Sequence, residues 1–217
     1  MQFVFEQIRL GGDRNFGYLV GDRSAGVAVI VDPAYAPELL VERAEAQSLR
    51  ITHIVNTHGH SDHIEGNPRA IELTGAPVAA FPGSAAEPDI ELNDGQSLEI
   101  GTYSLNCLHT PGHAADHLVL HEPDHQILLT GDLIFIGKVG GTATEEDGRV
   151  EWDSLQRVLA AVPDHSTVWP GHDYGIRPSS TIALEKETNP FLRCADVEAF
   201  LQFKGNWSNY KQENGLK

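Results

Sequence analysis

Short apolar segments separated by turn residues recur along this chain, and their spacing predicts β-strands. The first series of β-rich segments lies at residues 3–10, 15–21 and 27–32. A second series follows at residues 96–100, 103–109, 118–121 and 126–130. The segments within each series are short, and glycine or aspartate lies between most of them, which is typical of tight turns. The sequence therefore predicts two β-meanders, one in each half of the chain.

Helical periodicity follows each group of strands. Apolar positions at three- and four-residue spacing predict helices at residues 36–47, 68–73, 152–162, 180–188 and 195–203. Three further apolar strands lie between these helices, at residues 51–55, 78–81 and 166–169. Because a sheet and a helix each bury one apolar face, this order predicts two sheets packed face to face with helices outside. The chain shows no linker and no internal repeat, so we expect a single domain over residues 1–217.

Composition and charge narrow the class of protein. The 217 residues are 41% hydrophobic, which excludes intrinsic disorder and is enough for a buried core. The formal net charge of −16 disfavours nucleic acid and anionic membranes as partners, because both are negatively charged. The two cysteines are too few for a disulfide framework, and the first residues lack the basic and apolar regions of a signal peptide. We therefore expect a soluble, cytoplasmic protein with free thiols, and the sequence leaves its oligomeric state open.

The densest chemical signal is a run of metal-binding side chains directly after the strand at residues 51–55. Residues 57–63 are Thr-His-Gly-His-Ser-Asp-His, so four potential ligands lie within six residues. Imidazole and carboxylate groups are ligands that Zn²⁺ and similar divalent cations prefer. In an extended segment His58 and His60 share one side, while Asp62 and His63 can turn toward another. The segment can therefore serve two neighbouring metal ions.

Three further segments each place one potential ligand just past a predicted strand. They are Thr110-Pro111-Gly112-His113, Thr130-Gly131-Asp132 and Pro170-Gly171-His172. Loops at the ends of packed strands are where a rigid scaffold can present convergent groups. A chance cluster of histidines on a solvated loop does not explain this repeated placement, so the four segments together predict one metal site.

In this order, the four motifs resemble those of the metallo-β-lactamase superfamily, and the resemblance covers nearly the whole chain. It implies an α/β fold, a four-layer αββα sandwich of two mixed β-sheets with outer helices. It also implies a site for two divalent metal ions, most simply zinc, with iron or manganese as alternatives. The implied ligands are His58, His60 and His113 for the first metal, Asp62, His63 and His172 for the second, and Asp132 as the bridge between them.

The resemblance also implies a reaction. Two divalent cations can share one water and lower its pKa toward neutrality, which yields a bridging hydroxide able to attack an activated acyl carbon. Asp62 is expected to orient this nucleophile as well as to bind metal, and Asp132 is expected to hold the two cations together. These two carboxylates are therefore the predicted catalytic residues.

Two subfamilies compete for the activity. The tail from Arg177 to Arg193, with Thr-Asn-Pro-Phe at residues 188–191, is similar to glyoxalase II (hydroxyacylglutathione hydrolase), as is Asn67. This similarity implies a metal-dependent hydrolase, a thioesterase acting on a thioester or a similarly activated small acyl compound.

Persulfide dioxygenases share most of the same motifs and the segment Gly171-His172-Asp173-Tyr174. For that subfamily the resemblance implies a single iron held by His58, His113 and Asp132, with open coordination positions. A third possibility, from another class, is a non-catalytic metal-binding protein on the same fold. The complete ligand set argues against it.

Few basic residues are placed to bind an anionic small molecule. Both subfamilies usually carry a basic residue near the position taken here by Gly141, and this chain offers Lys138 instead. Near the C-terminus, the basic pattern that binds glutathione is reduced to Lys204. We expect these two lysines to bind a small acyl or thiol-containing substrate. The acidic segment 141–151 is expected to be a loop, either bordering the site or simply solvated.

Two residues beside the ligand motifs have two possible roles each. His117 either supports the metal site or packs in the core. Asp32 follows the apolar strand Val27–Val31, where it either hydrogen-bonds a metal-bound histidine or caps a turn.

Overall fold

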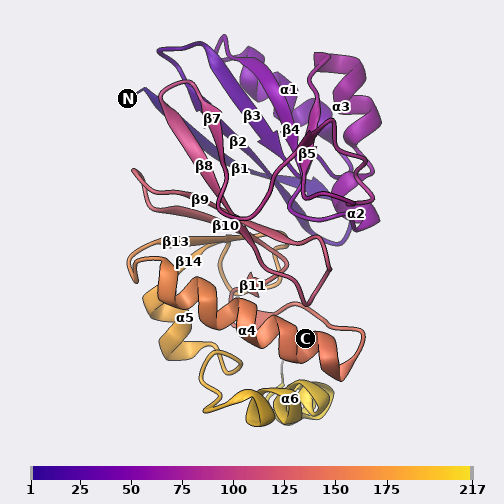
Figure 1. Ribbon diagram of the computed structural model, residues 1–217, viewed down its shortest axis with the longest axis vertical. Coiled ribbons are helices and arrows are strands. Elements are labelled where there is room, and N and C mark those ends of the chain that lie inside the picture. Colours follow the sequence, from indigo (N-terminus) through magenta and orange to yellow (C-terminus); the bar gives the residue numbers. More distant parts are fainter. Residues whose placement is uncertain (1, 216–217) are drawn as a thin grey trace.

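The computed structural model describes residues 2–215, and its two sheets lie between outer helices (Figure 1). In chain order, the elements are β1 (Phe3–Gly11), β2 (Asn15–Asp22), β3 (Val27–Val31), α1 (Pro37–Glu45), β4 (Arg50–Val55), α2 (Ser61–Ile64), α3 (Asn67–Thr74), β5 (Val78–Ala80), β6 (Ile90–Glu91), β7 (Ser97–Ile100), β8 (Tyr103–His109), β9 (Leu118–Glu122), β10 (Ile127–Gly131), β11 (Ile134–Phe135), β12 (Lys138–Val139), α4 (Glu145–Ala161), β13 (Thr167–Pro170), β14 (Ser180–Thr181), α5 (Ile182–Thr188), α6 (Val197–Gly205) and α7 (Trp207–Glu213).

Both large sheets are mixed and contain six strands. The first has the order β1-β2-β3-β4-β5-β6, in which β1, β2 and β3 are antiparallel and β3 to β6 are parallel. The second has the order β14-β13-β10-β9-β8-β7, in which only the β10–β13 pair is parallel. A separate hairpin joins β11 to β12. The two predicted meanders are therefore the antiparallel parts of the two sheets.

Alternating residues of the strands face different layers, which produces three apolar cores. In β3, Ile30 packs toward α1 and α3, whereas Val29 packs between the two sheets. In β10, Leu129 packs between the sheets, whereas Leu128 packs toward α4, α5 and α6. This is the two-residue period of a strand that is buried on both faces. The layers are helix, sheet, sheet, helix, so the predicted αββα sandwich is confirmed.

The segment expected to be an acidic loop is largely helical, so that prediction was wrong. Helix α4 starts at Glu145 and not at residue 152. Thr144 and Asp147 form a capping box, in which each side chain accepts a hydrogen bond from the other residue's backbone N–H. The acidic side chains of the first turn lie at the positive end of the helix dipole, which stabilises the start of the helix.

Several other short elements were not predicted, among them α2, α7, β6 and the β11–β12 hairpin, because segments of two to seven residues carry little periodic pattern. Cys107 and Cys194 are both free, as expected. Within residues 2–215, every helix is too short or too polar to cross a membrane.

Candidate metal centre

The four ligand motifs meet at one end of the sandwich because of how their strands pair. Strands β10 and β13 are parallel, so Asp132 and His172 follow them at the same edge of the second sheet. The N–H of Gly171 donates to the carbonyl of Gly131 at 2.7 Å and fixes these two loops together. The loop after β4 belongs to the first sheet, and its Thr57 carbonyl accepts a bond from Leu118 N at the start of β9 at 2.7 Å.

Three histidines form a first group of potential ligands. His60 Nδ1 lies 3.0 Å from His58 Nε2 and 3.0 Å from His113 Nε2. The ligand atoms of these three residues all lie within 4.8 Å of one another. His58 is fully buried, whereas His60 is exposed at the surface of the site. This is the triad that the resemblance assigns to a first metal.

A second group lies directly beside the first. His63 Nε2 is 3.2 Å from His172 Nε2, and Asp62 Oδ2 is 3.4 Å from His172 Nε2. Helix α2 begins immediately after the extended residue His60, so Asp62 and His63 lie on a helical turn. His63 also adjoins the first group, because its ring centroid lies 4.2 Å from that of His58.

Asp132 lies between the two groups. Its Oδ2 atom is 3.5 Å from His113 Nε2 and 3.3 Å from His172 Nε2. Its Oδ1 atom is 3.4 Å from His63 Nε2. The carboxylate therefore reaches a member of each group, which is the placement required of a bridging ligand.

The arrangement fits divalent metal ions by two tests. Ligand nitrogens at 2.0–2.1 Å from a tetrahedral Zn²⁺ are about 3.3 Å apart, and the nitrogens here are separated by 3.0–3.2 Å. Asp132 Oδ1 is also buried without a hydrogen-bond partner. An unpaired buried carboxylate oxygen is costly, and a cation at this position would satisfy it.

Backbone carbonyls orient two of the histidines. His113 Nδ1 lies 2.7 Å from the Gly141 carbonyl, and His172 Nδ1 lies 2.8 Å from the Asp13 carbonyl. Because a carbonyl can only accept, each Nδ1 carries a proton, so Nε2 is the nitrogen that each ring can offer to a metal.

Asp32 orients the loop and two more histidines. Its Oδ2 atom lies 3.0 Å from His63 Nδ1 and accepts a bond from the Thr57 hydroxyl at 2.7 Å. That hydroxyl is in turn 3.0 Å from His58 Nδ1. Oδ1 accepts from Thr57 N at 2.8 Å. Asp32 therefore contacts a potential ligand histidine and also caps the turn, so the contacts required by both of the roles considered from the sequence are present.

His117 contacts the backbone of Asp132, a potential carboxylate ligand. It is fully buried, and its Nε2 accepts a hydrogen bond from the backbone N–H of Asp132 at 3.0 Å. Its Nδ1 lies 2.8 Å from the Thr110 hydroxyl. Burial lowers the pKa of His117 to about 3, so the ring is neutral and Nε2 is an acceptor at physiological pH. The histidine therefore fixes the loop that carries Asp132.

Sequence reasoning missed Asn15 and undervalued Tyr174. Asn15 is buried and donates to Asp62 Oδ2 at 3.0 Å and to the Asp62 carbonyl at 3.1 Å. The Tyr174 ring stacks on His172, with centroids 4.6 Å apart and planes parallel to within 1°. Asn15 lies in a different part of the chain from every ligand motif, so no local pattern indicates it.

The two lysines expected to bind substrate have different surroundings. Lys138 Nζ lies 3.7 Å from the centre of the Tyr174 ring, which places this cation at the edge of the second ligand group. Lys204 is engaged within the protein. Its Nζ forms an ion pair with the buried carboxylate of Glu151 and donates to the Gly140 carbonyl at 2.8 Å.

The protonation of the histidines predicts how metal affinity depends on pH. Burial lowers the pKa of His58 and His113, so both are already unprotonated near neutrality. His172 and His63 differ. Although burial opposes the charged form of each, Asp132 raises the pKa of His172, and Asp132 and Asp32 together raise the pKa of His63 well above the usual value of about 6.5. A cation must displace these protons, so metal affinity should fall as pH decreases through the raised pKa values. Chelator competition from about pH 9 to about pH 6 measures this change in affinity. A metal affinity that does not change over that pH range would contradict the prediction.

A family model decides the identity of this fold and site. The model described as the metallo-beta-lactamase superfamily matches residues 10–172, which contain all seven potential ligands. The chain belongs to the metallo-beta-lactamase superfamily. Members of this superfamily bind divalent metals, which agrees with the ligand groups described above.

Relatives within the superfamily have two different names. A hydroxyacylglutathione hydrolase of Rhizobium johnstonii is 33% identical over 223 residues, covering 84% of each chain. The mitochondrial persulfide dioxygenase ETHE1 of Homo sapiens is 31% identical over 196 residues, covering 88% of this chain and 76% of that protein. The crystal structure of ETHE1 from Myxococcus xanthus matches with a TM-score of 0.86 at 30% identity, covering 94% of this chain and 91% of the other. The superfamily is thus established, and these relatives divide between a hydrolase and a dioxygenase.

Proposed function

We propose that this metallo-beta-lactamase superfamily protein is a metal-dependent hydrolase of a thioester or a similarly activated small acyl compound. The observation that carries the proposal is the pair of adjacent ligand groups that both contact the Asp132 carboxylate. A single catalytic metal needs only one such group. The hydroxyacylglutathione hydrolase among the relatives supports the same conclusion.

The geometry supports the following proposed roles. The first metal would be held by His58, His60 and His113, the second by Asp62, His63 and His172, and both by Asp132. Two divalent cations, for which we propose zinc, lower the pKa of a water and stabilise negative charge on the substrate carbonyl oxygen. Asn15 donates a hydrogen bond that fixes the Asp62 carboxylate, so Asp62 is the residue that we propose to orient the attacking water.

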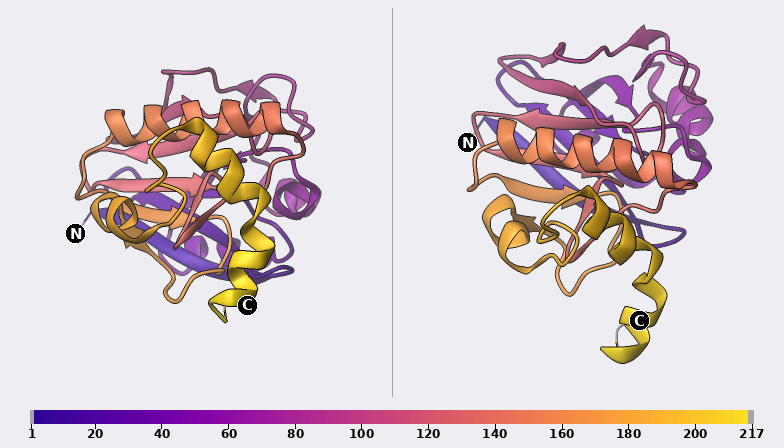
Figure 2. Two further views of the ribbon diagram at one scale, coloured as in Figure 1. Left: turned by 90° about the horizontal axis from the view of Figure 1, so that it is seen from below. Right: turned by 60° about the horizontal axis from the view of Figure 1, so that its bottom comes forward.

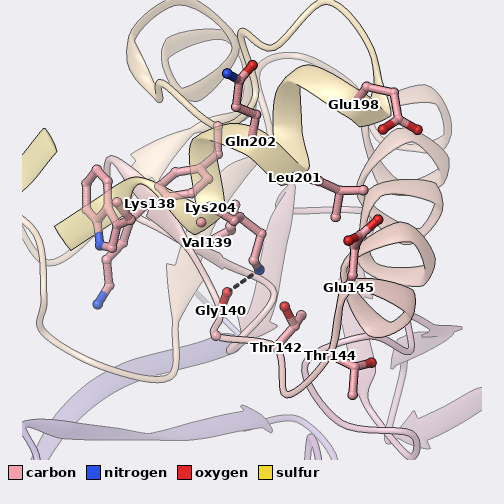
Figure 3. Close-up of a pocket in the computed structure, with 14 residues that line it drawn as sticks. Lys138, Val139, Gly140, Thr142, Thr144, Glu145, Glu198, Leu201, Gln202 and Lys204 are labelled. Carbon is pink, nitrogen blue, oxygen red and sulfur yellow. Dashed lines mark hydrogen bonds between the residues drawn. The ribbon is translucent and has the colours of Figure 1, made fainter. Parts of the chain in front are cut away.

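A cavity beside the centre offers room for the substrate. It has a volume of about 680 Å³ and lies between the loop after β12 and the helices α6 and α7 (Figure 3). Lys138 and Gly141, which lie next to the two ligand groups, line it, as do the aromatic rings of Phe191 and Trp207. Lys138 is the residue that we propose to bind a negatively charged part of the substrate.

Replacing Lys138 with alanine should therefore raise KM for an anionic thioester about tenfold and change kcat less. Loss of a charged hydrogen bond costs about 1.5–3 kcal/mol, and binding of the non-reacting part of the substrate affects KM first. Steady-state kinetics with a matched pair of anionic and neutral thioesters measures the effect. The neutral thioester serves as control and should keep its KM. An unchanged KM for the anionic substrate would remove Lys138 from the binding site.

A persulfide dioxygenase is the second candidate, and the similarity to the two ETHE1 proteins favours it. Such an enzyme needs one iron with two histidines, one carboxylate and open coordination positions. His58, His63 and Asp132 form a compact group of this composition. The resemblance assigns the iron to a similar set, in which His113 takes the place of His63. The same residues therefore serve either activity, and the number and kind of metal distinguish them.

Metal analysis combined with two assays tests the proposal. Mass spectrometry under native conditions counts the bound metals, and the same sample is assayed for thioester hydrolysis and for oxygen uptake with a persulfide. Two metal ions with hydrolysis would support the hydrolase. One iron with oxygen uptake and no hydrolysis would establish the dioxygenase instead. Bound metal without turnover in either assay, over a panel of esters and thioesters, would favour a non-catalytic binding protein.

A further inference from the structure

Helix α6 contacts the loop that orients a potential metal ligand. Lys204, near the end of α6, donates from Nζ to the carbonyl of Gly140 at 2.8 Å (Figure 3). The next carbonyl along the chain, that of Gly141, accepts from His113 Nδ1 at 2.7 Å. Two consecutive carbonyls are thus held, one by the lysine and one by the histidine.

The Gly140 peptide lies directly against the histidine ring. A Cβ atom at Gly140 would lie 3.0 Å from both Cγ and Nδ1 of His113, and 2.2 Å from the Asp132 carbonyl oxygen. A displacement of this peptide would therefore move the hydrogen-bond acceptor of His113 or press on the ring itself. The position of the peptide determines where the ring points.

The carboxylate partner of Lys204 belongs to a helix that packs against the loop residues directly before the same histidine. Glu151 lies in α4, and a Cβ atom at Gly112 would lie 2.4 Å from the Glu151 Cβ. One turn later, the Ser154 hydroxyl donates to the Pro111 carbonyl at 2.7 Å. Helices α4 and α6 lie side by side (Figure 2). The ion pair therefore joins the helix behind His113 to the helix that holds the Gly140 carbonyl.

General stability does not account for this ion pair. Glu151 is fully buried, the Lys204 side chain is only 13% exposed, and Glu151 Oε1 has no hydrogen-bond partner. Apolar side chains of similar volume commonly replace a buried ion pair at no loss of stability. An apolar side chain cannot, however, donate a hydrogen bond to the Gly140 carbonyl.

We propose that Lys204 is a positioning residue for His113. By holding the Gly140 carbonyl, the lysine fixes the peptide whose neighbouring carbonyl receives the His113 Nδ1–H, and so keeps His113 Nε2 directed toward His60. Lys204 lies outside the segment matched by the superfamily model, so the C-terminal helices add this contact to the common site. The inference rests on the proposed role of His113 as a ligand of the first metal.

The test is the metal affinity of a Lys204→Met variant. Substitutions in the residues that orient metal ligands weaken affinity about 10- to 100-fold. Because Lys204 acts through a peptide, we expect about tenfold weaker zinc binding at one of two sites in chelator competition, with the other site unchanged. The imidazole N–H resonance of His113 should also shift or broaden in NMR spectra of the metal-bound protein. Lys204→Arg keeps the donor and the charge, and should restore most of the affinity.

Lys186→Met is the matched control. Lys186, in α5, also bonds one carboxylate, Asp164, and one carbonyl, that of Leu159, but Leu159 lies in the last turn of α4, about two turns beyond Glu151. Its replacement should leave both zinc affinities and the His113 resonance unchanged.

A Glu151→Met, Lys204→Met double variant separates positioning from the effect of an unpaired buried acid. Burial raises the pKa of Glu151 to about 7 even though Lys204 opposes the shift, so the single variant can keep Glu151 neutral and fold. We expect the double variant to bind zinc as weakly as Lys204→Met.

Wild-type affinity in the double variant, or in Lys204→Met itself with an unmoved His113 resonance, would overturn the inference and leave the proposed hydrolase intact. A wild-type protein that binds no divalent metal would overturn both.

Discussion

Replacing Asp132 with asparagine should remove metal from both ligand groups and lower thioester hydrolysis by about 10³-fold or more, because the metals supply several kcal/mol of transition-state stabilisation. The two carboxylate oxygens reach His113, His172 and His63 at 3.3–3.5 Å. Asparagine has nearly the same shape, but it replaces one charged oxygen with an NH2 group. The NH2 group cannot coordinate a cation, and it would face the imidazole lone pairs.

Mass spectrometry of the native protein and a thioester assay measure the two effects of this substitution. Asp94→Asn is a suitable control, because Asp94 is a half-exposed carboxylate that pairs with Arg157 away from the centre. It should keep its metals and its turnover. An Asp132→Asn protein that retains two metal ions and the wild-type rate would refute the bridging role.

Replacing Gly171 with alanine should also empty the site, although glycine is not itself a ligand. An added Cβ would lie 2.4 Å from Asp132 Oδ1 and 2.9 Å from His63 Cε1, closer than real Cβ contacts allow. The backbone of Gly171 is not in the left-handed region, so the clash and not the dihedral angle is the reason for glycine in this Pro-Gly-His motif. Both side chains would have to move, and a displacement of about 1 Å can cost about 10²-fold in rate.

Gly205→Ala provides the comparison for Gly171→Ala, since a Cβ at Gly205 meets nothing within 4 Å. Zinc content and thermal unfolding of the two variants should be measured together. Gly171→Ala should lose metal while its far-UV circular dichroism stays native, and Gly205→Ala should keep its metal. Full zinc occupancy in Gly171→Ala would show that the carboxylate can occupy a different position from the one described here.

The ligand motifs could be predicted because each follows a strand directly. Strand identity depends on local pattern, and a ligand one or two residues beyond a strand end has only a short loop in which to move. Asp132 and His172 meet this condition, His58 lies three residues beyond β4, and all three lie in the centre. The four-layer arrangement was predictable for a related reason, since the order of apolar strands and amphipathic helices restricts how their faces can be buried.

Only some of the residues that support the potential ligands could be predicted. Asp32 and His117 had supporting roles among their alternatives, whereas Asn15 and Glu151 contact the site from elements far away in the sequence and no local pattern indicates them. Lys204 was expected to bind substrate and not to hold the Gly140 carbonyl. Backbone acceptors such as the Gly141 carbonyl leave no trace in the amino-acid sequence at all. The start of α4 was misplaced because charged residues conceal a helix whose first turn is stabilised by its cap and dipole.

The proposed ligands come from both halves of the sandwich. His58, His60, Asp62 and His63 follow a strand of the first sheet, whereas His113, Asp132 and His172 follow strands of the second. Ions bound between these residues would cross-link the two sheets at one end. Elsewhere the facing surfaces of the sheets are joined mainly by apolar packing. Because such ions bind the folded chain and not the unfolded one, resistance to heat should rise with the free zinc concentration. The chemistry of this protein and the cohesion of its two layers would then depend on the same ions.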